Sequence, residues 1–499
     1  MIKFRNQNKT RKQETRRTSM ISTMALLAAA ATVNFGNEVG KIRPELHSSG
    51  FAPQICSCSK ESVDLIRSMG FTACRTHDWA LTNPNQRVCD YFHIFPLIQL
   101  DANDPANYVF GPTDYLLGRA RNELGADIFF RLGTSIEHSG PKVHFNSLIP
   151  EDFDKVADVF AGIIRHYNKG WANGKEWGIK YWEIWNEPDG HNNMWCLPDG
   201  DGNNFYKTKE DKADYEARRT KRERLFAEFY AKCIKRIKGE FPEVKVGGPA
   251  LCYYNEKYFA ALLEECKKQG VAPDFISWHH YTHDPEIIVK SAEKARKFCD
   301  EMGFPNCELI VNEWHYFGKH YSWGDLRSAD PAKRAKAWEG PGAHNGIESS
   351  CFNLTALAQM QTSKLAQAYY YGCMYTGAWG FMDGGRNLYK VYYGLKLFGD
   401  LVKKYKTICE STCDGKGVTA LALKSADGSQ RAVLVIDYGA KAKSIELKAL
   451  GVPDGAKAKA WIHDYKRNFE PVPVKAGADG KIVLEKADEN SAAFLVTFE

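Results

Sequence analysis

Apolar and polar residues follow two different periods between residues 45 and 405. Short apolar, aromatic-rich runs have the length and composition of buried strands, and amphipathic stretches separate them. In residues 151–167 the apolar side chains recur every three or four positions, which predicts a helix. Strands are predicted at residues 71–79, 127–133, 180–188, 244–251, 275–282, 308–316 and 377–383, with a weaker first strand near 45–48.

Eight strands that alternate with helices predict an α/β protein built on a (β/α)8 TIM barrel, with an open doubly wound sheet as the alternative. Polar or ionisable residues stand at the carboxyl end of nearly every predicted strand. These are His77-Asp78, Asn186-Glu187, His279-His280-Tyr281, Asn312-Glu313 and Asp383. The barrel explains them better, because barrel active sites are built at that end of the strands, whereas an open sheet gathers such residues only where the strand order reverses.

The pattern changes after residue 405. Short alternating runs with turn signals, such as Asp427-Gly428, predict a small β-sandwich. The sequence therefore divides into a leader at 1–36, a catalytic barrel at 37–405 and an accessory β-sandwich at 406–499.

The leader is predicted from its charge and hydropathy. Seven basic residues and one glutamate lie within residues 1–17, ahead of the mostly apolar stretch Met20–Val33. This is too short to span a membrane and is typical of a signal peptide. Arg16-Arg17 resembles a twin-arginine signal, and a general secretory signal is the alternative. We therefore expect export to the periplasm or the extracellular space, with no membrane span elsewhere.

Composition excludes several classes of protein. A hydrophobic share of 44% fits a globular chain, and the net charge of +6 resides in the leader, so nothing predicts a nucleic-acid partner. The 14 cysteines contain no Cys-x-x-Cys pair, which argues against zinc ribbons and thioredoxin-like sites. Some would form disulfides in an oxidising compartment, and buried free thiols are an equally good interpretation for Cys74, Cys252 and Cys373.

Glu187 and Glu313 are the candidate catalytic pair. Each follows an asparagine and ends an apolar run, and the barrel order places them on strands four and seven. Their side chains would then face each other across the barrel mouth. Two carboxyl groups about 5–5.5 Å apart serve a retaining glycosidase as nucleophile and as general acid/base.

Several stretches resemble glycoside hydrolase family 39, the β-xylosidase and α-L-iduronidase family of the retaining (β/α)8 clan. The motifs are Trp185-Asn186-Glu187-Pro188, Asn312-Glu313-Trp314, Arg75-Thr76-His77, and His279 with Tyr281, and the resemblance covers about residues 45–405. One departure is Asp78, where a small residue would be expected after the histidine.

The resemblance implies a role for each matching residue. Glu187 would be the acid/base and Glu313 the nucleophile, while Asn186 would bind the sugar 2-hydroxyl. Tyr281 would orient Glu313, and His77 and His279 would contact the sugar. Outside the resemblance, Trp379 is a candidate pocket wall, with core packing equally possible, and Trp195, in the polar insert 189–219, is a candidate sugar contact.

We therefore expect a retaining, β-xylosidase-like hydrolase of an oligo- or polysaccharide of plant or matrix type, without cofactor or catalytic metal. The alternatives are an inactive glycan-binding protein on the same fold, or a clan enzyme with glucosidase-, endoglucanase- or iduronidase-like specificity. A metal hydrolase could use His279, His280, His283 and Asp284, but adjacent strand residues point to opposite faces and no helical metal motif is present. No phosphate-binding glycine motif indicates a nucleotide enzyme.

Overall fold

A computed structural model describes residues 28–50, 60–80, 87–135, 147–190, 194–197, 209–340, 342–372, 374–440, 442–477 and 480–499. The chain forms two compact units. One contains Arg43–Phe317 and Gln359–Leu388, and the other contains the segment ending at Ile42 together with Gly318–Ala358 and Tyr389–Glu499.

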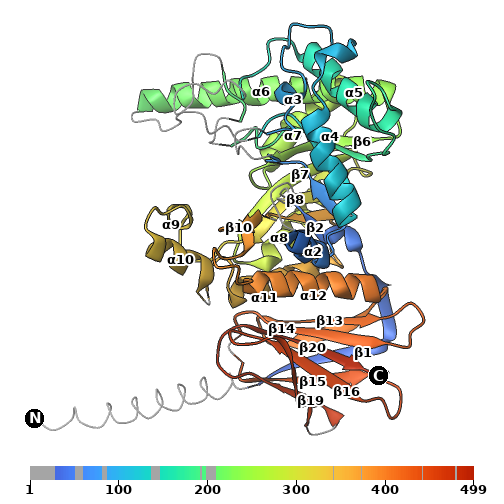
Figure 1. Cartoon of the computed structure of the whole chain (residues 1–499), viewed down its shortest axis with the longest axis vertical. Coiled ribbons are helices and arrows are strands. Elements are labelled where there is room, and N and C mark those ends of the chain that lie inside the picture. Colours follow the sequence, from blue (N-terminus) through green and yellow to red (C-terminus); the bar gives the residue numbers. More distant parts are fainter. Residues whose placement is uncertain are drawn as a thin grey trace, which may run out of the picture. The chain divides into compact units, whose positions relative to one another are not determined.

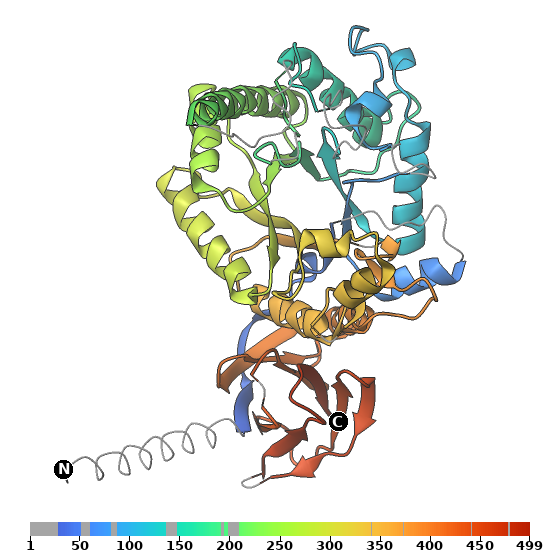
Figure 2. The ribbon, with the colours of Figure 1, turned by 90° about the vertical axis from the view of Figure 1, so that its left-hand side faces the viewer.

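The first unit is a closed barrel of eight parallel strands, which confirms the predicted fold class (Figures 1 and 2). Each strand pairs in parallel with its neighbours, and the eighth pairs with the first to close the ring. The strands are β2 (Ser48–Ser49), β3 (Ala73–Arg75), β4 (Asp127–Leu132), β5 (Tyr181–Ile184), β6 (Lys245–Leu251), β7 (Phe275–Thr282), β8 (Glu308–Tyr316) and β9 (Gln367–Tyr370).

The prediction of the eighth strand at 377–383 was wrong. The eighth strand is β9, and residues 377–383 instead contribute β11 (Gly380–Met382), which pairs only with β10 (Met374–Thr376) in a small separate sheet. The sequence around β9 resembles the end of a long helix, because no glycine or proline separates α11 (Ile347–Met360) from β9.

The barrel strands are linked by helices that surround them (Figure 2). Their caps follow the sequence: Asp152, Asn255 and Asp284 each accept a backbone N–H in the first turn of the helix that follows. The helices of this unit are α2 (Lys60–Ser68), α3 (Tyr91–Ile94), α4 (Gly111–Arg119), α5 (Phe153–Lys169), α6 (Lys209–Glu240), α7 (Glu256–Lys268) and α8 (Pro285–Glu301), with short turns at Pro44–Leu46, Pro105–Asn107 and Ala120–Leu124.

The second unit is built on one ten-stranded sheet, in the order β17-β16-β20-β14-β13-β12-β1-β15-β19-β18. Its strands are β1 (Ala28–Lys41), β12 (Thr407–Asp414), β13 (Val418–Lys424), β14 (Arg431–Asp437), β15 (Ser444–Leu450), β16 (Ala458–His463), β17 (Asn468–Val472), β18 (Lys475–Ala476), β19 (Ile482–Glu485) and β20 (Ala492–Phe498). The unit also contains α9 (Trp323–Leu326), α10 (Pro331–Glu339), α12 (Lys390–Lys404) and most of α11.

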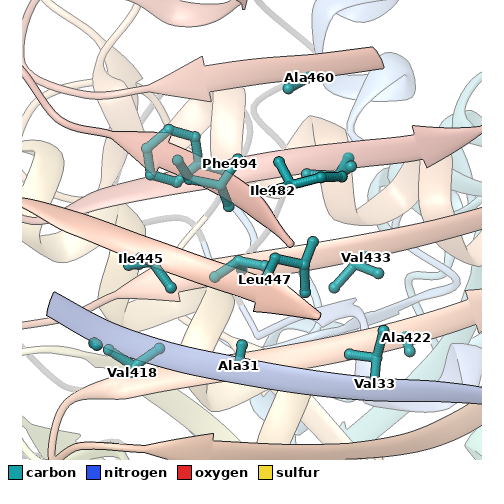
Figure 3. Close-up of a cluster of buried hydrophobic side chains, with 14 of the residues drawn as sticks. Ala31, Val33, Val418, Ala422, Val433, Ile445, Leu447, Ala460, Ile482 and Phe494 are labelled. Carbon is teal, nitrogen blue, oxygen red and sulfur yellow. The ribbon is translucent and has the colours of Figure 1, made fainter. Parts of the chain in front are cut away.

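The sheet curls so that its two halves enclose a single hydrophobic core. Val33 of β1, Val433 of β14, Ile445 of β15 and Phe494 of β20 belong to one buried cluster, although their strands are spread across the sheet (Figure 3). Strands this far apart can share a core only if the sheet folds back on itself, which is the arrangement expected of a sandwich.

Strand β1 belongs to this sheet, and the predicted leader overlaps it. Residues 1–27 lie outside the described residues, but residues 28–36 form the first part of β1, which pairs with β12 on one side and β15 on the other. The compact units therefore differ from a simple linear division of the chain, because the strand at the N-terminal end and residues 318–358 join the sheet unit.

The eleven described cysteines are all free thiols, and nine of them are buried. Cys74 is a buried thiol and Cys252 a half-buried one, as one of the two interpretations anticipated. Cys56, Cys58 and Cys373 lie outside the described residues. In the described part of the chain, no helix combines the length and apolar character needed to cross a membrane.

Candidate active site

The two glutamates meet at one end of the barrel. Glu187 follows β5, the fourth barrel strand, and Glu313 lies within β8, the seventh, as the barrel order predicted. A carboxylate oxygen of each lies within 4.8 Å of the other and of a ring nitrogen of His279. Inverting glycosidases hold their carboxyl groups about 6.5–9.5 Å apart, to leave room for a water molecule. The separation here is closer to that of retaining enzymes.

The backbone around Glu187 is strained. Trp185 and Glu187 adopt left-handed φ values of 74° and 46°, and Ala250 on β6 has a φ of 60°. The Glu187 amide donates a hydrogen bond to the Ala250 carbonyl at 2.9 Å, which links the two distorted segments. Bulky residues rarely occupy this region, and such strain concentrates at functional sites. Here it directs the end of β5 so that Glu187 faces Glu313.

Two strong donors hold the carboxylate of Glu313. Arg75, from β3, donates to Oε1 at 2.8 Å, and the hydroxyl of Tyr281, from β7, donates to Oε2 at 2.7 Å. Both bonds favour the ionised form of Glu313. An ionised carboxylate that is fixed in orientation is suited to attack as a nucleophile.

Arg75 is itself held by a buried network that the sequence did not single out. Its Nε donates to Glu183 of β5 at 2.6 Å, and its Nη2 donates to Asn186 at 2.7 Å. Glu183 is fully buried and also accepts from Ser277 at 2.6 Å and from Asn312 at 2.5 Å. Glu183 thus balances the charge of Arg75 and ties four barrel strands together beneath the two catalytic candidates. Glu183 lies inside the apolar run of β5, so the sequence alone did not mark it as part of the site.

The surroundings of Glu187 and Glu313 affect the pKa values of their carboxyl groups differently. Burial raises the pKa of Glu187 to about 7, an effect that Asp78 strengthens and that Cys252 and Arg75 oppose. Burial also raises the pKa of Glu313, and so does the charge of Glu187, while His279, Arg75 and Tyr281 lower it. Because the strongest donors contact Glu313, we assign the first ionisation to Glu313 and the retained proton to Glu187. That order suits a nucleophile and a general acid.

His279 bridges the pair. Its Nδ1 lies 3.0 Å from Glu187 Oε1 and 3.3 Å from Glu313 Oε2. Burial lowers the pKa of His279 to about 4, so the ring is neutral. A single N–H at Nδ1 therefore lies within reach of both carboxyl groups. The next residue, His280, faces away and contacts Ser291 of α8 at 2.7 Å. The predicted opposite orientation of these two histidines is confirmed.

His77 and Asn186 complete the polar wall. His77 Nε2 lies 3.7 Å from Glu313 Oε1, and burial and neighbouring cations hold the pKa of His77 well below its usual range. Three of the polar atoms here are buried and have no hydrogen-bond partner among the described residues: His77 Nδ1, Asn186 Nδ2 and His279 Nε2. Buried polar atoms normally have partners, so these are available to a ligand rich in hydroxyl groups.

The two tryptophan candidates differ. Trp379 is half-buried and packs edge-on against Tyr281 and Tyr371, with ring centroids 5.8 and 5.0 Å away, so it borders the group that orients Glu313. Trp195 is only 1% exposed and packs against Trp185 and Phe229. The expectation that Trp195 contacts sugar was therefore wrong, because its ring has no free face. Its position in a polar insert concealed its role in the core.

Asp189 and Cys252 lie immediately behind Glu187. The Cys252 amide donates to Asp189 Oδ1 at 3.0 Å, and both residues line a small cavity of about 90 Å³ with Arg219 and Tyr253. Burial raises the pKa of Asp189 to about 7 and that of the Cys252 thiol well above its usual range. Cys252 therefore remains a protonated thiol that donates toward Glu187.

Glu187, His279 and Glu313 are close enough to share a metal ion. However, Arg75 and Tyr281 already occupy one lone pair on each oxygen of Glu313. The guanidinium would also repel a second cation so close by. The arrangement is better suited to proton transfer and nucleophilic attack than to metal binding.

Comparisons with known proteins find similarity to glycoside hydrolases. The model of the family "Glycosyl hydrolases family 39" matches residues 205–302. A β-xylosidase from Geobacillus stearothermophilus is 23% identical over 186 residues, which are 33% of this chain and 32% of that protein. A β-xylosidase from Caldicellulosiruptor saccharolyticus is 24% identical over 320 residues, 57% of this chain and 55% of that protein. The chain thus spans about half or less of the length of these relatives.

Among the solved structures that share the fold are two glycosidases. A glucosidase from Croceicoccus marinus superposes with a TM-score of 0.67 at 21% identity, covering 95% of this chain and 99% of that one. A GH51 α-L-arabinofuranosidase from Thermotoga petrophila gives a TM-score of 0.62 at 11% identity, covering 95% and 100%. At these identities the likeness concerns the fold alone.

Proposed function

We propose that the chain belongs to glycosyl hydrolases family 39 and that it is a retaining glycoside hydrolase with Glu313 as nucleophile and Glu187 as general acid/base. The observation that carries the proposal is the close pair of carboxyl groups with unequal hydrogen bonding. Glu313 accepts from Arg75 and Tyr281, while Glu187 retains a proton to near-neutral pH.

In the first step Glu313 attacks the anomeric carbon while Glu187 gives its proton to the leaving oxygen. The bond between the anomeric carbon and the aglycone oxygen breaks, and a covalent glycosyl ester forms on Glu313. Asn186 Nδ2, buried at the base of the pair, is placed to donate to a sugar hydroxyl as charge develops on the ring.

In the second step Glu187, now ionised, removes a proton from water, which attacks the anomeric carbon and releases Glu313. Neutral His279 remains within hydrogen-bond distance of Glu187 and within 3.3 Å of Glu313. Because the ring is neutral, its N–H can donate to whichever carboxyl group is ionised at each step, and no additional cation is buried in the site.

We propose a β-xylosidase-like specificity toward a glycan of plant or matrix type, supported by the β-xylosidases among the relatives. Gluco- and arabino-configured substrates are the alternatives, since the fold neighbours include a glucosidase and an arabinofuranosidase. We also propose that the enzyme acts after export, supported by the basic and apolar segment at the start of the sequence.

The test is a panel of aryl xylo-, gluco-, galacto- and arabino-glycosides and an aryl iduronide, with product NMR to follow the anomeric configuration. Wild type is expected to cleave at least one with retention, and Glu313→Gln to lose at least about 10⁴-fold in kcat. Glu187→Gln is expected to lose more on substrates with poor leaving groups than on activated aryl glycosides, because only the former need the acid. Inversion would contradict the assignment of Glu313, and binding without cleavage would favour a glycan-binding protein.

A further inference from the structure

We infer that Asp78 is a specificity-determining residue that accepts a hydrogen bond from a hydroxyl group of a neutral sugar bound beside Glu313. The inference rests on the proposed function and names the class of sugar that the site takes. It concerns the residue, three positions after β3, at which the sequence departs from its resemblance to family 39.

Asp78 lies in the wall of the carboxyl pair. Its Oδ1 is 3.7 Å from Nε2 of His77, and the same nitrogen is 3.7 Å from Oε1 of Glu313. The charge of Asp78 also reaches the opposite side, where it contributes to raising the pKa values of Glu187 and Tyr371. His77 thus lies between the carboxylates of Asp78 and Glu313, within 3.7 Å of each.

This carboxylate is buried without a full set of partners. Asp78 is 6% exposed, and its Oδ1 has no hydrogen-bond partner among the described residues. Arg87 balances part of the charge, but its Nε is 3.8 Å from Oδ1, too far for a hydrogen bond. Nη1 of Arg87 donates instead to the Asp78 backbone carbonyl at 2.9 Å. Oδ1 of Asp78 is therefore a buried carboxylate oxygen that no donor among the described residues satisfies.

The backbone supports the same conclusion. Asp78 has a left-handed φ of 57°, and its amide lies 3.3 Å from the Ser135 hydroxyl. Asn and Gly adopt this conformation at least as easily as Asp, so the conformation alone does not require a carboxylate. A strained, buried and only partly satisfied charge is costly to a fold, and such features concentrate at ligand sites.

The chemistry of the wall selects the ligand. His77 Nδ1, Asn186 Nδ2 and His279 Nε2 are free among the described residues, and Asp78 adds an acceptor that only a donor can satisfy. A sugar hydroxyl both donates and accepts, so it can meet an acceptor and a neighbouring nitrogen together. A sugar carboxylate would be repelled by Asp78 and Glu313. The site therefore favours a neutral glycone over a uronide.

The test measures kcat/KM on the best neutral aryl glycoside and on its 2-, 3- and 4-deoxy analogues, for wild type and Asp78→Asn. We expect Asp78→Asn to lower kcat/KM on the parent by about 10- to 100-fold, because a hydrogen bond to a charged group is lost. On the one analogue that lacks the contacted hydroxyl, the loss should shrink to less than about threefold. The ratio of activity on a uronide to activity on the neutral parent should rise at least about tenfold.

Asp90→Asn is the matched control. Asp90 is a buried carboxylate whose oxygens are held by Arg131 and Ser135. Its replacement should lower stability and leave the pattern across the deoxy analogues unchanged. Asp78→Gly should lose the same activity as Asp78→Asn without a lower Tm, since glycine accepts the left-handed backbone. An equal loss on every analogue, or no loss on any, would overturn the inference.

A binding measurement separates this inference from the proposed function. Calorimetry with xylose, glucose, galactose and arabinose should show at least one sugar that binds wild type and binds Asp78→Asn about tenfold more weakly. Binding that depends on Asp78 without any cleavage would refute the hydrolase and keep the inference. If wild type and Asp78→Asn cleave the substrate equally fast and bind the sugar equally well, the inference is refuted and the hydrolase is kept. No binding and no cleavage would refute both.

Discussion

Replacing Tyr281 by phenylalanine should shift the pH dependence of the enzyme in one direction only. The Tyr281 hydroxyl donates to Oε2 of Glu313 at 2.7 Å, and burial keeps the pKa of this phenol well above its usual range. It therefore remains a donor at every pH at which the enzyme would be assayed. Its removal leaves Arg75 on Oε1 as the remaining strong donor to Glu313.

The size of the shift follows from the bond that is lost. A hydrogen bond to a charged group contributes about 1.5–3 kcal/mol, and one pKa unit corresponds to about 1.4 kcal/mol. Loss of the bond destabilises the ionised form of Glu313, so its pKa should rise by about 1 to 2 units. In the proposed mechanism Glu313 attacks in its ionised form, so the acidic limb of the kcat/KM profile should move up by the same amount.

The assay is kcat/KM from pH 4 to 9 on the best aryl glycoside, for wild type and Tyr281→Phe. Tyr108→Phe is the control, because Tyr108 is a buried tyrosine that donates to the neutral carbonyl of Ala102 at 2.8 Å. This control should lower Tm slightly and leave both limbs in place. An unmoved acidic limb in Tyr281→Phe, with activity lost equally at all pH values, would refute the reasoning.

Three further predictions follow from the same structure. The folded protein holds the pKa of Glu187 at about 7, above the unfolded value, so the unfolded state ionises first and stability falls as pH rises from about 4.5 to 7. Glu187→Gln should therefore raise Tm at pH 8, by a stabilisation of about 3 kcal/mol, and leave it unchanged at pH 4, as calorimetry at both values would reveal. Cys252→Ala removes a donor to Glu187 and should move the basic limb of the kcat/KM profile up by about 0.5–1 pH unit, whereas a downward shift would contradict this. If a leader is removed on export, mass spectrometry should place the new N-terminus at or before Ala28, and a start at residue 37 would contradict the pairing of β1.

The barrel and the meeting of Glu187 with Glu313 were predictable because the strands carry strong local signals. Asn186-Glu187 and Asn312-Glu313 each stand near the end of a long apolar run, so their strand numbers followed from simple counting. Tyr281 and His279 share a face because strand residues two apart point the same way.

Other features depend on contacts that no local pattern encodes. The eighth strand was misplaced because no glycine or proline separates residues 367–370 from the preceding helix, so helix and strand resemble one amphipathic stretch. Glu183 is a polar residue inside a strand, and only its burial against Arg75 identifies it as part of the site. Trp195 was misassigned because a polar insert contains one side chain that returns to the core.

The position of β1 has a consequence for the order of events during synthesis. Ala30 pairs with Asp414, so the first strand to leave the ribosome must wait for a partner made 384 residues later. At about 5–20 residues per second that delay is roughly 20 to 80 s. Throughout that time Ala31, Val33 and Phe35 have no core to enter. A chain that cannot pair this strand until residue 414 has been made gives a chaperone or an export receptor time to bind the segment around β1 before folding buries it.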